Sequence, residues 1–165
     1  MKTFFTNKST IYYTTALNTI LFLILVTLFA TACGSVERRT FEDEAGAIRG
    51  YDPVAYFTVG KPVKGQANIT AQHDGGTYHF SSEEHRDLFT NDPQRYAPQY
   101  GGYCAYAMSK GFVVSTVPEA WHIYKDKLYL NYSLGVRKTW LKKKDEYIAK
   151  ADKNWAEKLR DGIED

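Results

Sequence analysis

The pattern of apolar and polar positions divides the chain into an apolar leader and one domain of mixed secondary structure. An uncharged apolar run extends from Ile20 to Ala30 and ends in small residues. Beyond it, hydrophobic residues occur in short alternating stretches, which favour half-buried strands, and from about Ser133 they recur with the period of a helix. We therefore expect short strands and helices first and a longer helix at the end.

Alternation and turn residues predict two hairpins. The expected strands are residues 67–73, 77–80, 112–115, 120–124 and 128–132. An Asp-Gly-Gly turn at 74–76 closes the first hairpin, and Lys-Asp-Lys at 125–127 closes the second. The register places Tyr78 and Phe80 on one face of their strand. In the second hairpin, Trp121 and Ile123 lie on the face opposite His122 and Tyr124.

Capping signals predict the short helices. Asp52 before Pro53 is an N-cap with proline at the first helical position, which opens a single turn over 54–57. Ser81 and Glu84 have the spacing of a capping box, and the helix that they open extends to about Thr90. A further short helix over 103–109 would contain Cys104.

The C-terminal part has the stripe of a long amphipathic helix, and its break near Lys144 can divide it in two. The stripe residues are Trp140, Tyr147, Ile148, Ala151, Trp155 and Leu159. The predicted fold class is therefore α+β: small antiparallel β hairpins packed with short helices and a long C-terminal amphipathic helix.

The leader has the features of an exported lipoprotein. Lys2 and Lys8 precede the apolar run, and Cys33 follows Ala-Thr-Ala in the manner of a bacterial lipoprotein cleavage site. We expect a signal peptide at 1–32, a lipidated tether at 33–49 and a domain at 50–165. An uncleaved anchor and ordinary cleavage without lipid are the alternatives. No Asp follows Cys33, so a Gram-negative host would hold the protein at its outer membrane, on the periplasmic side.

Charge argues against a nucleic-acid partner. Removing Lys2 and Lys8 with the leader lowers the 21 basic side chains to 19, equal to the 19 acidic ones. Nucleic-acid binding requires a clustered basic face, and a domain with equal numbers of basic and acidic side chains does not indicate one. The predicted partners are the membrane, through the lipid, and a metal ion or an envelope protein.

Cysteine content raises a question about Cys104. The chain has 2 cysteines, and lipidation of Cys33 would leave Cys104 without an intramolecular partner, which excludes a disulfide framework. An unpaired thiol in an oxidising compartment is buried, bound to metal or reactive. No C-x-x-C, H-E-x-x-H or phosphate-binding glycine loop is present, so we expect a binding domain rather than an enzyme.

Several spaced motifs resemble the YHS domain family over about residues 50–132. They are Asp-Pro-Val at 52–54, Tyr-His-Phe-Ser-Ser at 78–82 and His-Arg at 85–86, followed by Phe89, Pro93 and Tyr96. The closing helix is similar to the longer, exported branch of that family. In metal-linked members the resemblance implies a thiolate site, but here Ala55, Ser81 and His85 stand at the cysteine positions. Metal binding through those thiolates is therefore not expected.

A different ligand set remains for a soft metal. Cys104 and Met108 lie four residues apart, and with His85 or His79 they would suit cuprous copper. The alternative for each residue is a structural role, with Cys104 and Met108 as core. A second hypothesis needs no metal: Tyr96, Tyr100, Tyr103 and Tyr106 would form a face that binds a small molecule or a protein.

Overall fold

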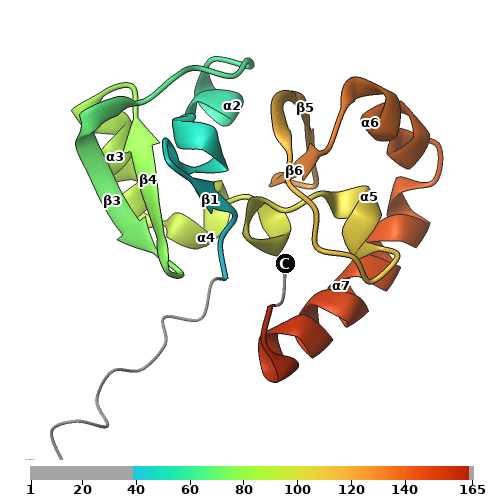
Figure 1. The fold of residues 1–165 in the computed structure, drawn as a ribbon. Coiled ribbons are helices and arrows are strands. Elements are labelled where there is room, and N and C mark those ends of the chain that lie inside the picture. The colour runs from blue at the N-terminus through green and yellow to red at the C-terminus, as the bar shows by residue number, and fades with distance from the viewer. Residues whose placement is uncertain (1–38, 164–165) are drawn as a thin grey trace, which may run out of the picture. The chain divides into compact units, whose positions relative to one another are not determined.

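The computed structural model describes residues 39–163 (Figure 1). The predicted signal peptide, Cys33 and the first part of the tether lie outside the described residues. The strands are β1 (Glu42–Asp43), β2 (Gly46–Ala47), β3 (Gln66–His73), β4 (Gly76–Phe80), β5 (Val117–Tyr124) and β6 (Lys127–Asn131). The helices are η1 (Ile48–Gly50), α2 (Ala55–Thr58), α3 (Glu83–Asn91), α4 (Pro93–Tyr96), η2 (Gln99–Gly102), α5 (Ala105–Met108), α6 (Leu134–Leu141) and α7 (Lys144–Asp161). The predicted α+β class is confirmed.

The described strands form three antiparallel pairs, β1–β2, β3–β4 and β5–β6. Both predicted hairpins are present, and each turn has two central residues in the left-handed region. These are Asp74 and Gly75 at φ 45° and 76°, and Lys125 and Asp126 at 51° and 56°. Such turns match the right-handed twist of the flanking strands. The predicted register of the first hairpin is confirmed, because Tyr78 and Phe80 are both buried.

Three local predictions need correction. Ser82, not Ser81, caps α3, with its hydroxyl accepting from the His85 N–H. Residues 112–115 form no strand, and β5 starts only at Val117. Helix α5 starts at Ala105, so Cys104 is its N-cap residue rather than part of its interior.

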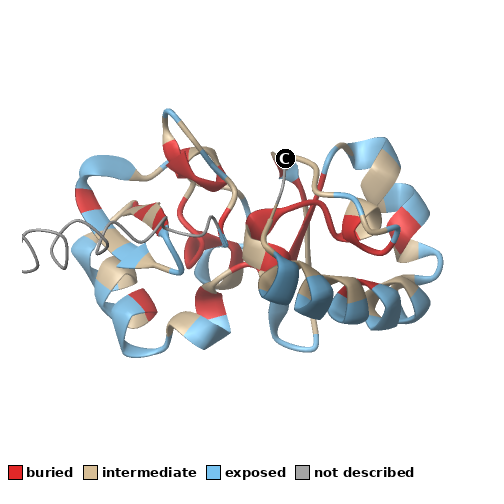
Figure 2. Cartoon of the chain, turned by 60° about the horizontal axis from the view of Figure 1, so that its bottom comes forward, coloured by how far each residue is buried: buried red, intermediate tan, exposed pale blue. Residues whose placement is uncertain are grey.

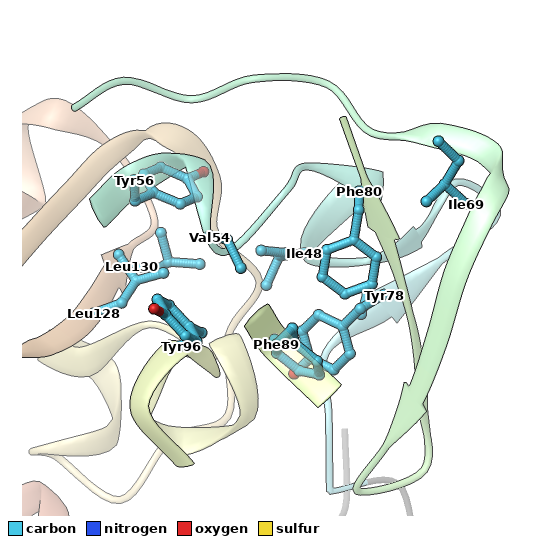
Figure 3. Close-up of a cluster of buried hydrophobic side chains, with 11 residues drawn as sticks. Ile48, Val54, Tyr56, Ile69, Tyr78, Phe80, Phe89, Tyr96, Leu128 and Leu130 are labelled. Atoms are coloured by element: carbon cyan, nitrogen blue, oxygen red, sulfur yellow. The ribbon is translucent and has the colours of Figure 1, made fainter. Parts of the chain in front are cut away.

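Two hydrophobic clusters form the core, and the β5–β6 hairpin supplies residues to both. The first cluster, drawn in Figure 3, contains the buried residues Ala47, Ile48, Val54, Tyr56, Ile69, Tyr78, Phe80, Phe89, Tyr96, Leu128 and Leu130. The second contains Tyr100, Tyr103, Ala105, Met108, Tyr129, Trp140 and Ala151. Because neighbours in a strand point to opposite faces, Leu128 and Leu130 pack in the first cluster and Tyr129 in the second.

The C-terminal stripe divides as predicted into α6 and α7. Trp140 on α6 is 0% exposed and lies 5.2 Å from the Tyr129 ring. Tyr147, Ile148 and Trp155 on α7 pack against the second cluster, while much of the rest of α7 is exposed (Figure 2). None of the helices within 39–163 is both long and apolar enough to cross a membrane.

Candidate functional site

Cys104 lies within the protein interior, surrounded by backbone groups. Its side chain is 1% exposed, and its sulfur accepts hydrogen bonds from the N–H groups of Ala107 at 3.5 Å and Tyr132 at 3.3 Å. The thiol donates to the side-chain oxygen of Asn131 at 3.8 Å. Met108 is 0% exposed and packs in the second cluster. The contacts of both residues are those of core side chains.

The two predicted imidazole ligands lie elsewhere. His79 is on β4, where its ring packs against the backbone of Gly46: a Cβ added to that glycine would lie 2.8 Å from His79 Nε2. His85 is on α3 and contacts Asp52. Within residues 39–163, no three His, Cys, Asp or Glu side chains come together as a metal site would require. The structure therefore does not assemble the copper ligand set, and copper binding stays a prediction from the sequence.

Asp52 is the centre of a buried polar cluster that the sequence analysis did not identify. Its side chain is fully buried, and Oδ1 accepts from the N–H groups of Val54 at 2.9 Å and Ala55 at 3.3 Å. Oδ2 accepts from Ser81, through N–H at 2.8 Å and the hydroxyl at 2.6 Å, and from His85 Nδ1 at 2.6 Å. Five donors around one carboxyl group suit a carboxylate anion, which only accepts.

This cluster fixes the chemistry of His85. Because Asp52 only accepts, Nδ1 of His85 carries a proton and Nε2 is the nitrogen left for other partners. Nε2 lies 3.1 Å from the Thr58 hydroxyl, which also lies 3.1 Å from the Val54 carbonyl oxygen. The imidazole is 14% exposed. The pair thus holds one imidazole nitrogen near the surface in a fixed orientation.

The same cluster contains the positions at which the family resemblance implies cysteines. Ala55 donates its N–H to Asp52, and Ser81 and His85 bind the other oxygen of that carboxylate. Ala55 offers no side-chain donor atom, and the carboxylate oxygens are already occupied by N–H and O–H groups. These residues do not fit a thiolate metal centre. Hydrogen bonds and apolar packing hold these segments together in this chain.

A cavity of about 280 Å³ lies beside Tyr100, and we call it the Tyr100 cavity. Its lining comes from the residues before β1, the end of β3, the β3–β4 turn, β4, α4, the segment between α4 and η2, η2 and α7. The lining residues are Arg39, Thr40, His73, Asp74, Tyr78, Gln94, Ala97, Pro98, Gln99, Tyr100, Gly101, Asp152, Trp155, Ala156 and Leu159. The mixture of aromatic walls with a few charged groups is typical of small-molecule sites.

The left-handed backbone of η2 positions Tyr100. Tyr100 and Gly101 have φ of 58° and 59°, and a Cβ at Gly101 would overlap the carbonyl of Arg39. The turn therefore needs glycine at 101. It directs the Tyr100 hydroxyl to Asp152, to which it donates at 2.8 Å. The Tyr100 ring lies 6.2 Å from the Trp155 ring at 70°.

Burial and nearby carboxylates raise the pKa values of Tyr78 and Tyr100, which line the cavity, and of Tyr129, whose ring lies 6.0 Å from that of Tyr100. Burial raises the pKa of Tyr100, and the hydrogen bond to Asp152 raises it further. Burial also raises the pKa of Tyr78, with Asp74 contributing in the same direction. Burial, followed by the charge of Asp152, raises the pKa of Tyr129 to about 12. All three phenols therefore keep their protons at neutral pH.

The predicted tyrosine face is not a single surface. Tyr96 is 7% exposed in the first cluster, and Tyr100 and Tyr103 are each 4% exposed in the second. Tyr106 is half-buried, with its ring 5.1 Å from that of Tyr147. Of the four, Tyr100 lines the cavity. Asp152 and Trp155 were not among the predicted site residues. Trp155 lies on the predicted helical stripe, and Asp152 precedes it by three residues on α7, so the two share a face.

The site thus belongs to an α+β domain with an aromatic cavity and, separately, a buried carboxylate–imidazole cluster. Comparisons with family models, with curated proteins and with solved structures give no match for this chain. The resemblance to the YHS domain family therefore stays a prediction that rests on the residues quoted for it.

Proposed function

We propose that this chain is an exported, lipid-anchored binding protein whose ligand site is the Tyr100 cavity. The observation that carries the proposal is the cavity itself, about 280 Å³ with Tyr78, Tyr100 and Trp155 among its lining residues. Aromatic walls supply apolar contact, and a few fixed polar groups orient a ligand. Export and lipidation are supported by the sequence around Cys33.

The volume limits the ligand to a small molecule. Small-molecule sites commonly span about 300–1,000 Å³, so this cavity, at about 280 Å³, lies just below that range. It suits a compact metabolite better than a nucleotide cofactor or a peptide. The hydrogen bond between the Tyr100 hydroxyl and the Asp152 carboxylate holds both groups in place. Polar groups held in this way are suited to orienting a bound ligand.

The experiment uses three small probes of nearly equal shape and different charge. They are choline, neohexyl alcohol, which replaces the choline nitrogen by carbon, and the anion of tert-butylacetic acid. Saturation-transfer NMR with the purified protein would detect binding of each. We expect at least one probe to bind the wild type and to lose its signal in Ala156→Trp, because Ala156 lines the cavity.

Lys153→Trp is the matched control, since Lys153 is an exposed residue of α7 outside the cavity lining. It should leave the signal unchanged. A signal that is absent for all three probes, or that survives in Ala156→Trp, would contradict the proposed function.

A further inference from the structure

Carboxylates give the Tyr100 cavity a negative character. Asp152 accepts one hydrogen bond, from Tyr100 at 2.8 Å, and makes no ion pair with any other residue of 39–163. Asp74 lies 3.4 Å from His73 Nε2. Arg39 also lines the cavity, and it is exposed, as are Asp74 and Asp152. An anionic ligand would therefore meet two carboxylates and one guanidinium in the lining.

The aromatic lining favours the same sign of charge. The rings of Tyr100 and Trp155 both line the cavity and lie 6.2 Å apart at 70°. The face of an aromatic ring carries partial negative charge and attracts a cation within about 6 Å. The Tyr100 proton is used in its bond to Asp152, so the hydroxyl oxygen can offer a lone pair to a ligand.

We propose that the Tyr100 cavity binds a small organic cation, a protonated amine or a quaternary ammonium, with Asp152 as counter-ion and the Tyr100 and Trp155 rings as its walls. The inference rests on the proposed function and adds the ligand's charge and chemical class. A cation of this kind is weakly hydrated over its alkyl groups, so it gains apolar contact with the rings and charge attraction together. A neutral molecule of the same shape gains the first contribution alone.

The test compares choline with neohexyl alcohol by titration calorimetry or quantitative NMR on the purified protein. We expect choline to bind about tenfold more tightly than the alcohol, a ratio that corresponds to a moderately desolvated cation–π and ion-pair contact. Asp152→Asn should weaken choline binding by about tenfold and change alcohol binding by less than about twofold. Asparagine keeps an oxygen acceptor for the Tyr100 hydroxyl, so the Tyr100 ring should keep its position in the cavity lining.

Asp145→Asn is the matched control. Asp145 lies on α7, as Asp152 does, and it also accepts a hydrogen bond from a tyrosine hydroxyl, that of Tyr124, at 2.8 Å. It lies outside the cavity lining and should leave choline binding unchanged. If the alcohol binds as tightly as choline, or if Asp152→Asn leaves the ratio unaltered, the cation inference is wrong while the cavity remains a binding site. If neither probe binds and the tert-butylacetate anion is also silent, the proposed function is wrong as well.

Discussion

At the scale of single residues, Asp52 connects three segments through one carboxylate. It receives the N–H groups of Val54 and Ala55 at the start of α2, both donors of Ser81 after β4, and the imidazole of His85 on α3. A fully buried anion is costly unless every lone pair is used. Here the donors come from residues far apart in sequence, so the carboxylate stabilises the folded arrangement only when all of them are in place.

Asp52→Asn tests this role. The amide NH₂ would face the N–H and hydroxyl of Ser81, donors against donors, and leave buried groups without acceptors. We expect the free energy of unfolding to fall by about 3 kcal/mol. Urea denaturation followed by circular dichroism measures it.

The control for this substitution is Asp92→Asn. Asp92 also caps a helix, accepting from the Arg95 N–H, but it is exposed. Asparagine caps a helix about as well as aspartate, so the change should be below about 0.5 kcal/mol. Equal losses in the two variants would mean that the buried cluster contributes no more than an ordinary cap.

At the scale of elements, the start of α3 shows how a tertiary contact changes a local signal. The serines at 81 and 82 are both good caps, and the spacing from Ser81 to Glu84 favours the first. Asp52 binds the Ser81 hydroxyl at 2.6 Å, so that hydroxyl is not available as a cap. Ser82 takes the role and accepts from His85.

Ser82→Ala should therefore weaken the helix. We expect a loss of about 1 kcal/mol in the free energy of unfolding, because the His85 N–H loses its acceptor. Ser115→Ala serves as the control, since the Ser115 hydroxyl makes no hydrogen bond within the described part of the chain. Thermal and urea unfolding of both variants would measure the difference. A Ser82→Ala protein as stable as the Ser115→Ala protein would show that the cap contributes little.

The elements that sequence predicts well are those set by local patterns. The two hairpins follow from alternation and from turn residues such as Asp74 and Gly75, and the division near Lys144 follows from the helical period. Elements fixed by distant contacts are predicted poorly. Residues 112–115 are mostly apolar but pair with no strand. Cys104 has an extended backbone and precedes α5, and its N–H donates to the Val114 carbonyl.

At the scale of the whole domain, the candidate site illustrates the same limit. Tyr100 belongs to the tyrosine face predicted from the sequence, and in the structure it lines the cavity. Its partner Asp152 lies 52 residues further along the chain, and no local spacing connects the two. The predicted copper ligands His79, His85 and Cys104 lie in different parts of the fold, and no spacing in the sequence determines the contacts between those parts. Copper binding therefore stays a prediction.

Attachment to a membrane, which the sequence predicts, is a property of the whole chain. The apolar run from Ile20 to Ala30 is shorter than the roughly 20 residues that cross a bilayer, so lasting attachment would depend on lipid at Cys33. A diacyl thioether buries two acyl chains in the bilayer, which is enough for stable anchoring.

We expect the wild type to sediment with the envelope membranes and to incorporate labelled palmitate. Cys33→Ser should do neither if it is processed by another peptidase, and Cys104→Ser, which alters the other cysteine, should keep both properties. Palmitate incorporation that persists in Cys33→Ser would place the lipid elsewhere, whereas a wild type that carries no label would favour cleavage without lipidation.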